Sequence, residues 1–243
     1  TSAKSNVEVL YKQNTTNSLF SLTYIFERGD NDNKMLSLAA DYIDLLGTDK
    51  YSAEELKQQF YNLACDYRIT VNENQTFFNL SGLSENMDQA LTLFEEFLTN
   101  CKPDEAALAA MKQNLLQARI NNKADQRENY VRLTAYVQYG PENTYTNIYS
   151  NNELMALTSE QLLSSIKELM GYDHTILYYG PMSVENFVED INKVHAIPDE
   201  LKPMPESKRF VQLQTKEDKV FIAPYDAKQI YMISYSNTGE TFD

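Results

Sequence analysis

The spacing of apolar residues changes twice within the first 83 residues, and this change limits the possible folds more than any other feature of the sequence. Apolar residues alternate or run together in residues 6–14, 18–29, 66–71 and 75–83, and between the second and third stretches they recur every three or four residues. A period of two indicates β-strands, and a period near 3.6 indicates helices. We therefore expect a β-hairpin, two helices and a second β-hairpin.

The two expected helices, residues 34–46 and 52–63, have clear end signals. Gly47 can adopt the left-handed conformation that ends a helix. Ser52 followed by Glu55 predicts a capping box, in which the hydroxyl accepts a bond from an early amide and the carboxylate accepts one from the serine amide. The first helix has a single apolar face and should be largely buried; that face consists of Leu36, Ala39, Ala40, Ile43 and Leu46.

Further helices are expected over residues 85–100, 103–122, 124–140, 158–171 and 183–194, with one strand at 174–180. Together these elements predict an α+β domain over residues 1–195, an antiparallel sheet with helices packed chiefly on one face. The polar segment 196–208 holds three prolines and is typical of a linker. Three strand-like runs in residues 209–243 then predict the opening strands of a truncated second domain of the same kind.

Charge and hydropathy argue against two classes of partner. The chain has 21 basic and 35 acidic residues, a net charge of −14, and so repels the phosphate backbone of nucleic acids. No apolar run approaches the roughly 20 residues that a membrane-spanning helix needs. We expect no nucleic-acid partner and no membrane span. Cys65 and Cys101 lack C-x-x-C spacing, and we expect both to be free, packed thiols.

Few residues offer obvious chemistry. The acidic runs "LFEEF" and "NFVED" predict solvated helix faces. His174 precedes a strand and should be hydrogen-bonded or exposed, whereas His195 ends a helix, where an imidazolium suits the dipole. Neither histidine has a visible nucleophile partner. The tyrosine-rich residues 136–149 admit two interpretations, a wall that holds a peptide or a plain surface loop.

Three longer segments, "LLGTDKYSAEELKQQFYNLA", "GLSENMDQALTLFEEFL" and "KPDEAALAAMKQNLLQ", resemble the M16 zinc peptidases, the insulinase/pitrilysin family. The resemblance covers roughly residues 5–195 as one family-type domain. It implies a protein of two halves, each of two such domains, that close around an unfolded peptide. It also implies a zinc motif, H-x-x-E-H, on the helix just before the Gly-Thr break, with a further Glu ligand downstream.

This sequence departs from that motif. The corresponding positions carry Leu38, Asp41 and Tyr42, and the downstream ligand falls near Arg119. An aliphatic side chain cannot bind zinc, and phenol is a poor substitute for imidazole. The chain has only two histidines, both outside this helix. We therefore expect no catalytic, cofactor-binding or metal-binding residues here, with Leu38, Asp41 and Tyr42 as degenerate motif positions.

By the resemblance, we expect the chain to be the non-catalytic half of an M16-like zinc metallopeptidase, inactive by itself, with zinc and the general base in an absent catalytic half. The expected partners are that half, in the same chain or a separate subunit, and a peptide substrate. A structural or scaffolding subunit of the same fold is the alternative, and a stand-alone hydrolase with a different site is a third hypothesis. The sequence does not determine the cellular compartment. The bacterial periplasm or cell envelope is one option, because bacterial relatives are often exported.

Overall fold

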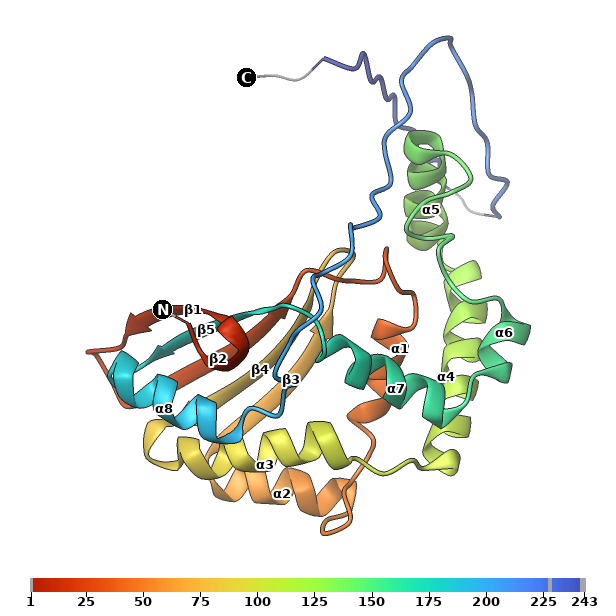
Figure 1. The fold of residues 1–243 in the computed structure, drawn as a ribbon. Helices are drawn as coiled ribbons and strands as arrows, with labels where there is room; N and C mark the ends of the chain where they lie inside the picture. The colour runs from red at the N-terminus through yellow and green to blue at the C-terminus, as the bar shows by residue number, and fades with distance from the viewer. Residues whose placement is uncertain (1, 227–228, 241–243) are drawn as a thin grey trace. The chain divides into compact units, whose positions relative to one another are not determined.

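The computed structural model describes residues 2–226 and 229–240 (Figure 1). Two compact units divide the chain: residues up to Leu108 with Leu157–Ser207 form the first, and Ala109–Ala156 with the residues from Lys208 form the second. The strands are β1 (Glu8–Gln13), β2 (Leu19–Phe26), β3 (Cys65–Val71), β4 (Thr76–Leu83) and β5 (Thr175–Gly180). The helices are α1 (Leu36–Ile43), α2 (Ala53–Asn62), α3 (Met87–Asn100), α4 (Glu105–Lys123), α5 (Gln126–Tyr139), α6 (Asn151–Ala156), α7 (Ser159–Leu169) and α8 (Val184–Val194), with short 3₁₀ turns at Lys4–Asn6 and Ser84–Asn86.

The first unit contains a five-stranded sheet in the order β1-β5-β2-β4-β3. The second expected hairpin is confirmed, since β3 and β4 are antiparallel with Val71 opposite Thr76. The first expected hairpin is wrong: β5 lies between β1 and β2, parallel to β1 and antiparallel to β2. Local sequence shows that two strands are adjacent along the chain, but a strand from residue 175 onward can still insert between them. The sheet is therefore mixed at one edge.

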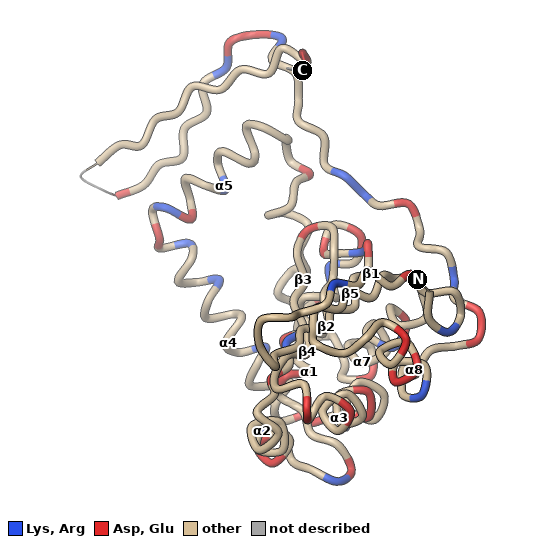
Figure 2. Tube along the Cα trace, turned by 90° about the vertical axis from the view of Figure 1, so that its left-hand side faces the viewer, with Lys and Arg blue, Asp and Glu red and all other residues tan. Residues whose placement is uncertain are grey.

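Helices cover one face of this sheet, as expected for the α+β class. The helices α1, α2 and α3 pack against β3 and β4, and α8 packs on α3 (Figure 1). The covered face of β2 carries a fully buried alternating series, Phe20, Leu22, Tyr24 and Phe26. The opposite face is open and partly apolar, because Leu10, Leu177 and Tyr179 are 47%, 40% and 41% exposed. Asp and Glu residues lie along α2, α3 and α8 (Figure 2).

The local signals for helix starts are confirmed. The Ser52 hydroxyl accepts from the Glu55 amide at 3.3 Å, and the Glu55 carboxylate accepts from the Ser52 amide at 2.9 Å. Thr158 and Gln161 form a second capping box at the start of α7. Cys65 and Cys101 are free and buried, as predicted. In the described part of the chain, no helix combines the length and hydropathy needed to cross a bilayer.

The described residues between 209 and 240 contain no strand, although strand-like sequence runs through them. A β-strand forms a series of backbone hydrogen bonds with a neighbouring strand, whereas the backbone hydrogen bonds of this segment are isolated. The Leu213 amide donates to the Gln138 carbonyl at 2.7 Å, and the Thr215 amide donates to the Asn237 carbonyl at 2.8 Å. One boundary between the compact units follows Ser207, and residues 109–156 belong to the second unit.

Two adjacent phenylalanines test which sheet face forms the core. Phe78 is fully buried beside Phe26, with ring centroids 5.1 Å apart, whereas Phe77 points to the opposite face and is half-buried. We expect Phe78→Ala to lower the free energy of unfolding by about 3–5 kcal/mol. The matched control Phe77→Ala should cost about 1 kcal/mol. Urea unfolding followed by circular dichroism measures both, and equal costs would contradict the assignment of the core to the helical face.

Candidate functional site

Helix α1 carries the three degenerate motif positions, and they have different surroundings. Leu38 is half-buried, Asp41 is exposed, and Tyr42 is fully buried. The Tyr42 hydroxyl accepts a bond from the Asp104 amide at 2.9 Å and lies 2.8 Å from the Ser159 hydroxyl. Ser159 in turn donates to the Glu105 carboxylate at 2.5 Å, so Tyr42 is the donor to Ser159. Tyr42 thus connects α1 with the starts of α4 and α7 and serves packing.

The side chains at these positions do not fit a zinc ion. Among the residues that the structure describes, no group of three or more His, Cys, Asp or Glu side chains is arranged to hold a metal. Arg119, where a downstream ligand would fall, belongs to the second unit and donates to the Asn151 side chain at 2.6 Å. A guanidinium supplies positive charge and no metal-binding lone pair.

A pocket of about 350 Å³ lies beside the exposed side of α1, between this helix and the edge strand β3. Burial and the charges of Asp30 and Asp44 raise the pKa of Asp41, which lines the pocket. Tyr67, from β3, is 9% exposed. Burial, followed by the charges of Asp44 and Asp66 and a hydrogen bond with Asp44, raises the pKa of its hydroxyl. The pocket is lined by both signs of charge, the carboxylates of Asp41 and Asp44 and the guanidinium of Arg68.

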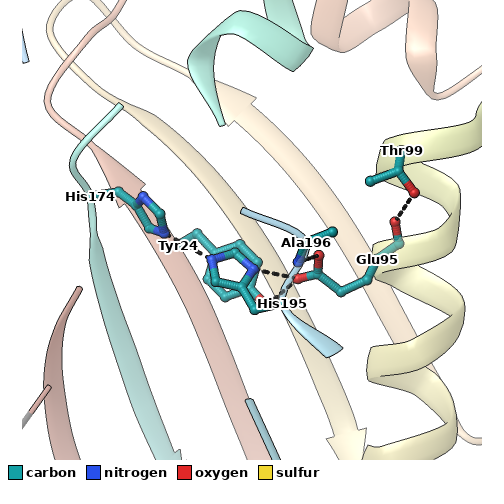
Figure 3. A network of polar contacts seen from close by, with 6 residues as sticks. All are labelled: Tyr24, Glu95, Thr99, His174, His195 and Ala196. Atoms are coloured by element: carbon teal, nitrogen blue, oxygen red, sulfur yellow. Dashed lines mark hydrogen bonds and ion pairs between the residues drawn. The ribbon is translucent and has the colours of Figure 1, made fainter. Parts of the chain in front are cut away.

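A second polar cluster is buried between the sheet and α3 (Figure 3). The Glu95 carboxylate accepts bonds from the Tyr24 hydroxyl at 2.6 Å and the Ala196 amide at 3.0 Å, and it lies 2.8 Å from Nδ1 of His195. Nε2 of His195 lies 2.9 Å from Nε2 of His174. Both histidines of the chain thus meet in one cluster, together with a glutamate that is 3% exposed.

The hydrogen bonds assign the protons in this cluster. Nδ1 of His174 lies 2.9 Å from the Tyr172 carbonyl, which can only accept, so this nitrogen carries a proton. Two further donors on Glu95 favour its carboxylate form, to which Nδ1 of His195 donates. The arrangement is a buried Glu95–His195 pair in contact with His174.

The pKa values follow this arrangement. Burial by itself would raise the pKa of Glu95, but bonds from His195, Tyr24 and the Ala196 amide bring it below its ordinary value. Burial raises the pKa of Tyr24 well above its ordinary value, and the Glu95 charge adds to this effect. Burial lowers the pKa of His174 to about 4, and the neighbouring His195 contributes to the decrease. The cluster is nearly closed to solvent, since Glu95, His174 and His195 are 3%, 7% and 5% exposed.

Sequence reasoning missed this cluster. The run "LFEEF" was expected to be a solvated helix face, but only Glu96 fits, being half-exposed beside Lys50, whereas Glu95 is buried. One signal was available: Glu95 follows Leu91 by four residues and precedes Leu98 by three, which places it on the apolar face of α3. The pairing of His174 with His195 had no local signal.

The tyrosine-rich residues 136–149 lie in the second unit. Tyr136 and Tyr145 are 44% and 37% exposed, and the Arg132 guanidinium lies 5.3 Å from the Tyr145 ring centroid. The buried Asn143 side chain donates to the Gly140 carbonyl at 2.8 Å and holds the turn after α5. An ordered turn with exposed rings is compatible with both interpretations of this segment.

The Tyr42 contacts lead to a direct test. Tyr42→Phe removes one hydroxyl and leaves the Asp104 amide and the Ser159 hydroxyl without that partner, so we expect the free energy of unfolding to fall by about 1–3 kcal/mol. Tyr61→Phe on α2 is the matched control, because Tyr61 is 78% exposed, and it should change stability by less than about 0.5 kcal/mol. Urea unfolding measures both; a neutral Tyr42→Phe would show that the hydroxyl contributes nothing to packing.

The buried cluster predicts a pH dependence. The pKa of His174 is about 4 in the folded chain, below its ordinary value of 6.5, so the unfolded chain binds more protons between these values. Stability should therefore be complete above pH 6.5 and fall as the pH approaches 4, by at most about 1.4 kcal/mol per pH unit from this group. The lowered pKa of Glu95 adds a loss in the same direction at lower pH.

Unfolding free energies measured from pH 4 to 7 check this prediction. In His174→Gln the slope should decrease, because the titrating group is gone. Glu95→Gln should lower stability strongly, since it leaves His195 without its buried partner. Glu96→Gln, the exposed neighbour, should have little effect. Parallel curves for wild type and His174→Gln would contradict the assigned role of His174.

Comparisons with known proteins agree with this fold. Residues 37–149 match the family model described as Insulinase (Peptidase family M16). No curated protein matches the chain by sequence. The periplasmic protease PqqL from Escherichia coli matches with a TM-score of 0.72 at 16% identity, over 85% of this chain and 24% of that chain.

Two further solved structures have a similar fold. The peptidase M16 inactive domain from Pseudomonas fluorescens matches with a TM-score of 0.69 at 19% identity, over 85% of this chain and 52% of that chain. The first half of PqqL matches with a TM-score of 0.62 at 11% identity, over 86% of this chain and 47% of that chain. This chain therefore spans between a quarter and a half of the length of these structures. Residues 37–149 are thus similar to the insulinase family of peptidases, family M16, and the chain has the α+β fold of these M16 structures.

Proposed function

We propose that this chain is the non-catalytic half of an M16 zinc metallopeptidase, or part of it, and that it helps to enclose and hold a peptide. The observation that carries the proposal is the set of side chains that α1 presents at the motif positions. This helix stands where the family places its zinc motif, but Leu38 cannot bind a metal and the Tyr42 hydroxyl is engaged with Asp104 and Ser159. Zinc and the general base would come from a catalytic half, in the same polypeptide or a separate subunit.

Two features support a role in holding peptide. The sheet face opposite the helices is open and carries exposed Leu10, Leu177 and Tyr179, which suit contact with apolar side chains. The strand β3 is an edge of the sheet, and an edge strand can pair with an extended peptide backbone. A solved structure named as an M16 inactive domain has the same fold, which is compatible with a half that has lost its motif.

The expected domain organisation is part of this proposal: a domain at 1–195, a linker at 196–208 and the start of a second domain at 209–243. In the last segment Val220, Ile222, Ile230 and Met232 are 87%, 81%, 93% and 91% exposed. Val220 and Ile222 are two residues apart, as are Ile230 and Met232, and this is the spacing of side chains on one face of a strand. Such a face needs a covering layer, which further chain from the same domain would supply.

The test compares this chain alone with this chain plus an H-x-x-E-H-containing half of the same protein. Alone, it should hold no stoichiometric zinc and cleave no member of a mixed peptide library. With the catalytic half added, cleavage should appear, stop with a chelator and return with zinc. Elemental analysis and mass spectrometry of the peptides measure both properties.

Two outcomes would contradict the proposal. Stoichiometric zinc or chelator-resistant cleavage by the chain alone would mean that α1 was misinterpreted or that another site exists. Full activity of the catalytic half without this chain, combined with no binding of peptide to this chain, would favour the scaffolding alternative. A catalytic half whose motif Glu is replaced by Gln serves as the control for contaminating peptidases.

A further inference from the structure

The chain that follows α8 lies on the first unit as a short strap, residues 196–202. At the start of the strap, the Ala196 amide donates to the Glu95 carboxylate at 3.0 Å. At its end, the Lys202 amide donates to the Gly171 carbonyl at 2.9 Å. Further along, the chain enters the second unit, so the strap is part of the connection between the two units.

Both histidines of the chain lie where the strap is attached. His195 directly precedes the strap, and His174 directly follows Asp173, whose amide donates to the Lys202 carbonyl at 2.8 Å. Nε2 of His195 lies 2.9 Å from Nε2 of His174 (Figure 3). The contact between the two rings therefore links the start of the strap to the segment that holds its end.

The hydrogen bonds of the cluster leave the two rings no position for a further proton. One proton lies between Glu95 and Nδ1 of His195, one between the two Nε2 atoms, and one between Nδ1 of His174 and the Tyr172 carbonyl. With these three protons, the two rings and the carboxyl group together carry no net charge. A fourth proton on the rings would place two protons in one bond and leave a positive charge in a buried site.

The groups packed directly around His174 do not favour such a charge. From β2, the rings of Tyr24 and Phe26 lie 6.1 Å and 4.8 Å from the His174 ring, measured between centroids. The Glu95 charge, from α3, favours the protonated ring, but burial outweighs it and lowers the pKa of His174 to about 4. The neighbouring His195 contributes to this decrease.

The charged groups farther out have both signs. The Arg28 guanidinium and the Lys202 ammonium each lie 5.8 Å from the centroid of the Tyr172 ring. Glu168, from α7, accepts a bond from the Tyr172 hydroxyl at 3.1 Å. Asp173 is exposed beside His174. These groups do not supply a buried anion for a protonated His174.

The strap has few other contacts that would keep it in place. Ile197 is the only buried side chain among its residues, all of which the structure describes. Asp199 pairs with Lys4 at 3.5 Å, but these side chains are 95% and 43% exposed, and such pairs contribute little. The sheet instead buries large side chains such as Tyr24 and Phe78 completely. Segments with little burial open locally before the core does.

We propose that the Glu95–His195–His174 cluster is an acid-sensitive latch: an added proton breaks the contact between the two rings and releases the strap, while the sheet and helices of the first unit stay folded. Release gives His195 access to water and lengthens the free connection to the second unit. This inference concerns regulation and does not depend on the proposed peptide-holding function.

Hydrogen exchange of the 243-residue chain tests the latch, measured by mass spectrometry at pH 7 and pH 5 and corrected for the intrinsic rate at each pH. The released strap binds more protons, because the pKa of His174 returns from about 4 to its ordinary 6.5. The strap amides should therefore be about 20-fold less protected at pH 5 than at pH 7. Fragments from β2 and β4 should keep their protection.

Two variants separate the latch from other acidic groups. In His174→Gln the titrating ring is gone, and the change in strap protection between pH 7 and pH 5 should fall below about twofold. Asp199→Asn is the matched control, because it removes an exposed carboxylate from the strap itself and breaks the pair with Lys4. This control should keep the 20-fold pH dependence.

A second measurement needs no variant. The chain has only two histidines, so its ring signals are easily followed by NMR as the pH is lowered. One ring, that of His174, should titrate at about pH 4 instead of 6.5. Titration of both rings near pH 6.5 would show that solvent protons reach them in the latched chain, and it would overturn the proposal.

The exchange data can also contradict the latch. Loss of protection in the strap together with β2 and β4 would mean that the cluster holds the whole unit and forms no separate latch. Equal strap protection at pH 7 and pH 5 would overturn the proposal as well. The same conclusion follows if the pH dependence persists in His174→Gln or disappears in Asp199→Asn.

Discussion

A carboxylate buried in a helix–sheet core must be paired, and the pairing of Glu95 organises the first unit. Its partners come from three other segments: Tyr24 from β2, His195 from the end of α8, and the Ala196 amide from the chain that follows. His174, just before β5, completes the set through His195. Two strands and two helices therefore share one polar contact, and removing any member leaves a buried group unsatisfied.

This arrangement commits one sheet face to the core and leaves the other available. The helices cover the face that carries Tyr24 and Phe78, while β3 remains an edge beside α1. Tyr42 fixes α1 through Asp104 and Ser159, so the hydroxyl of a buried phenol holds this helix against the starts of α4 and α7.

The remaining polarity of α1 lies on its exposed side. Asp41 and Asp44 line a pocket beside the edge strand, together with Tyr67 and Arg68 from β3.

The sequence by itself determined the helices other than the short α6, the second hairpin and the α+β class, because capping boxes such as Ser52 with Glu55 and periodic apolar faces are local signals. Only the tertiary structure decided that β5 separates β1 from β2, and that Glu95 meets a histidine 100 residues away. Such contacts depend on which distant segments pack together, and no local pattern in the chain encodes that choice.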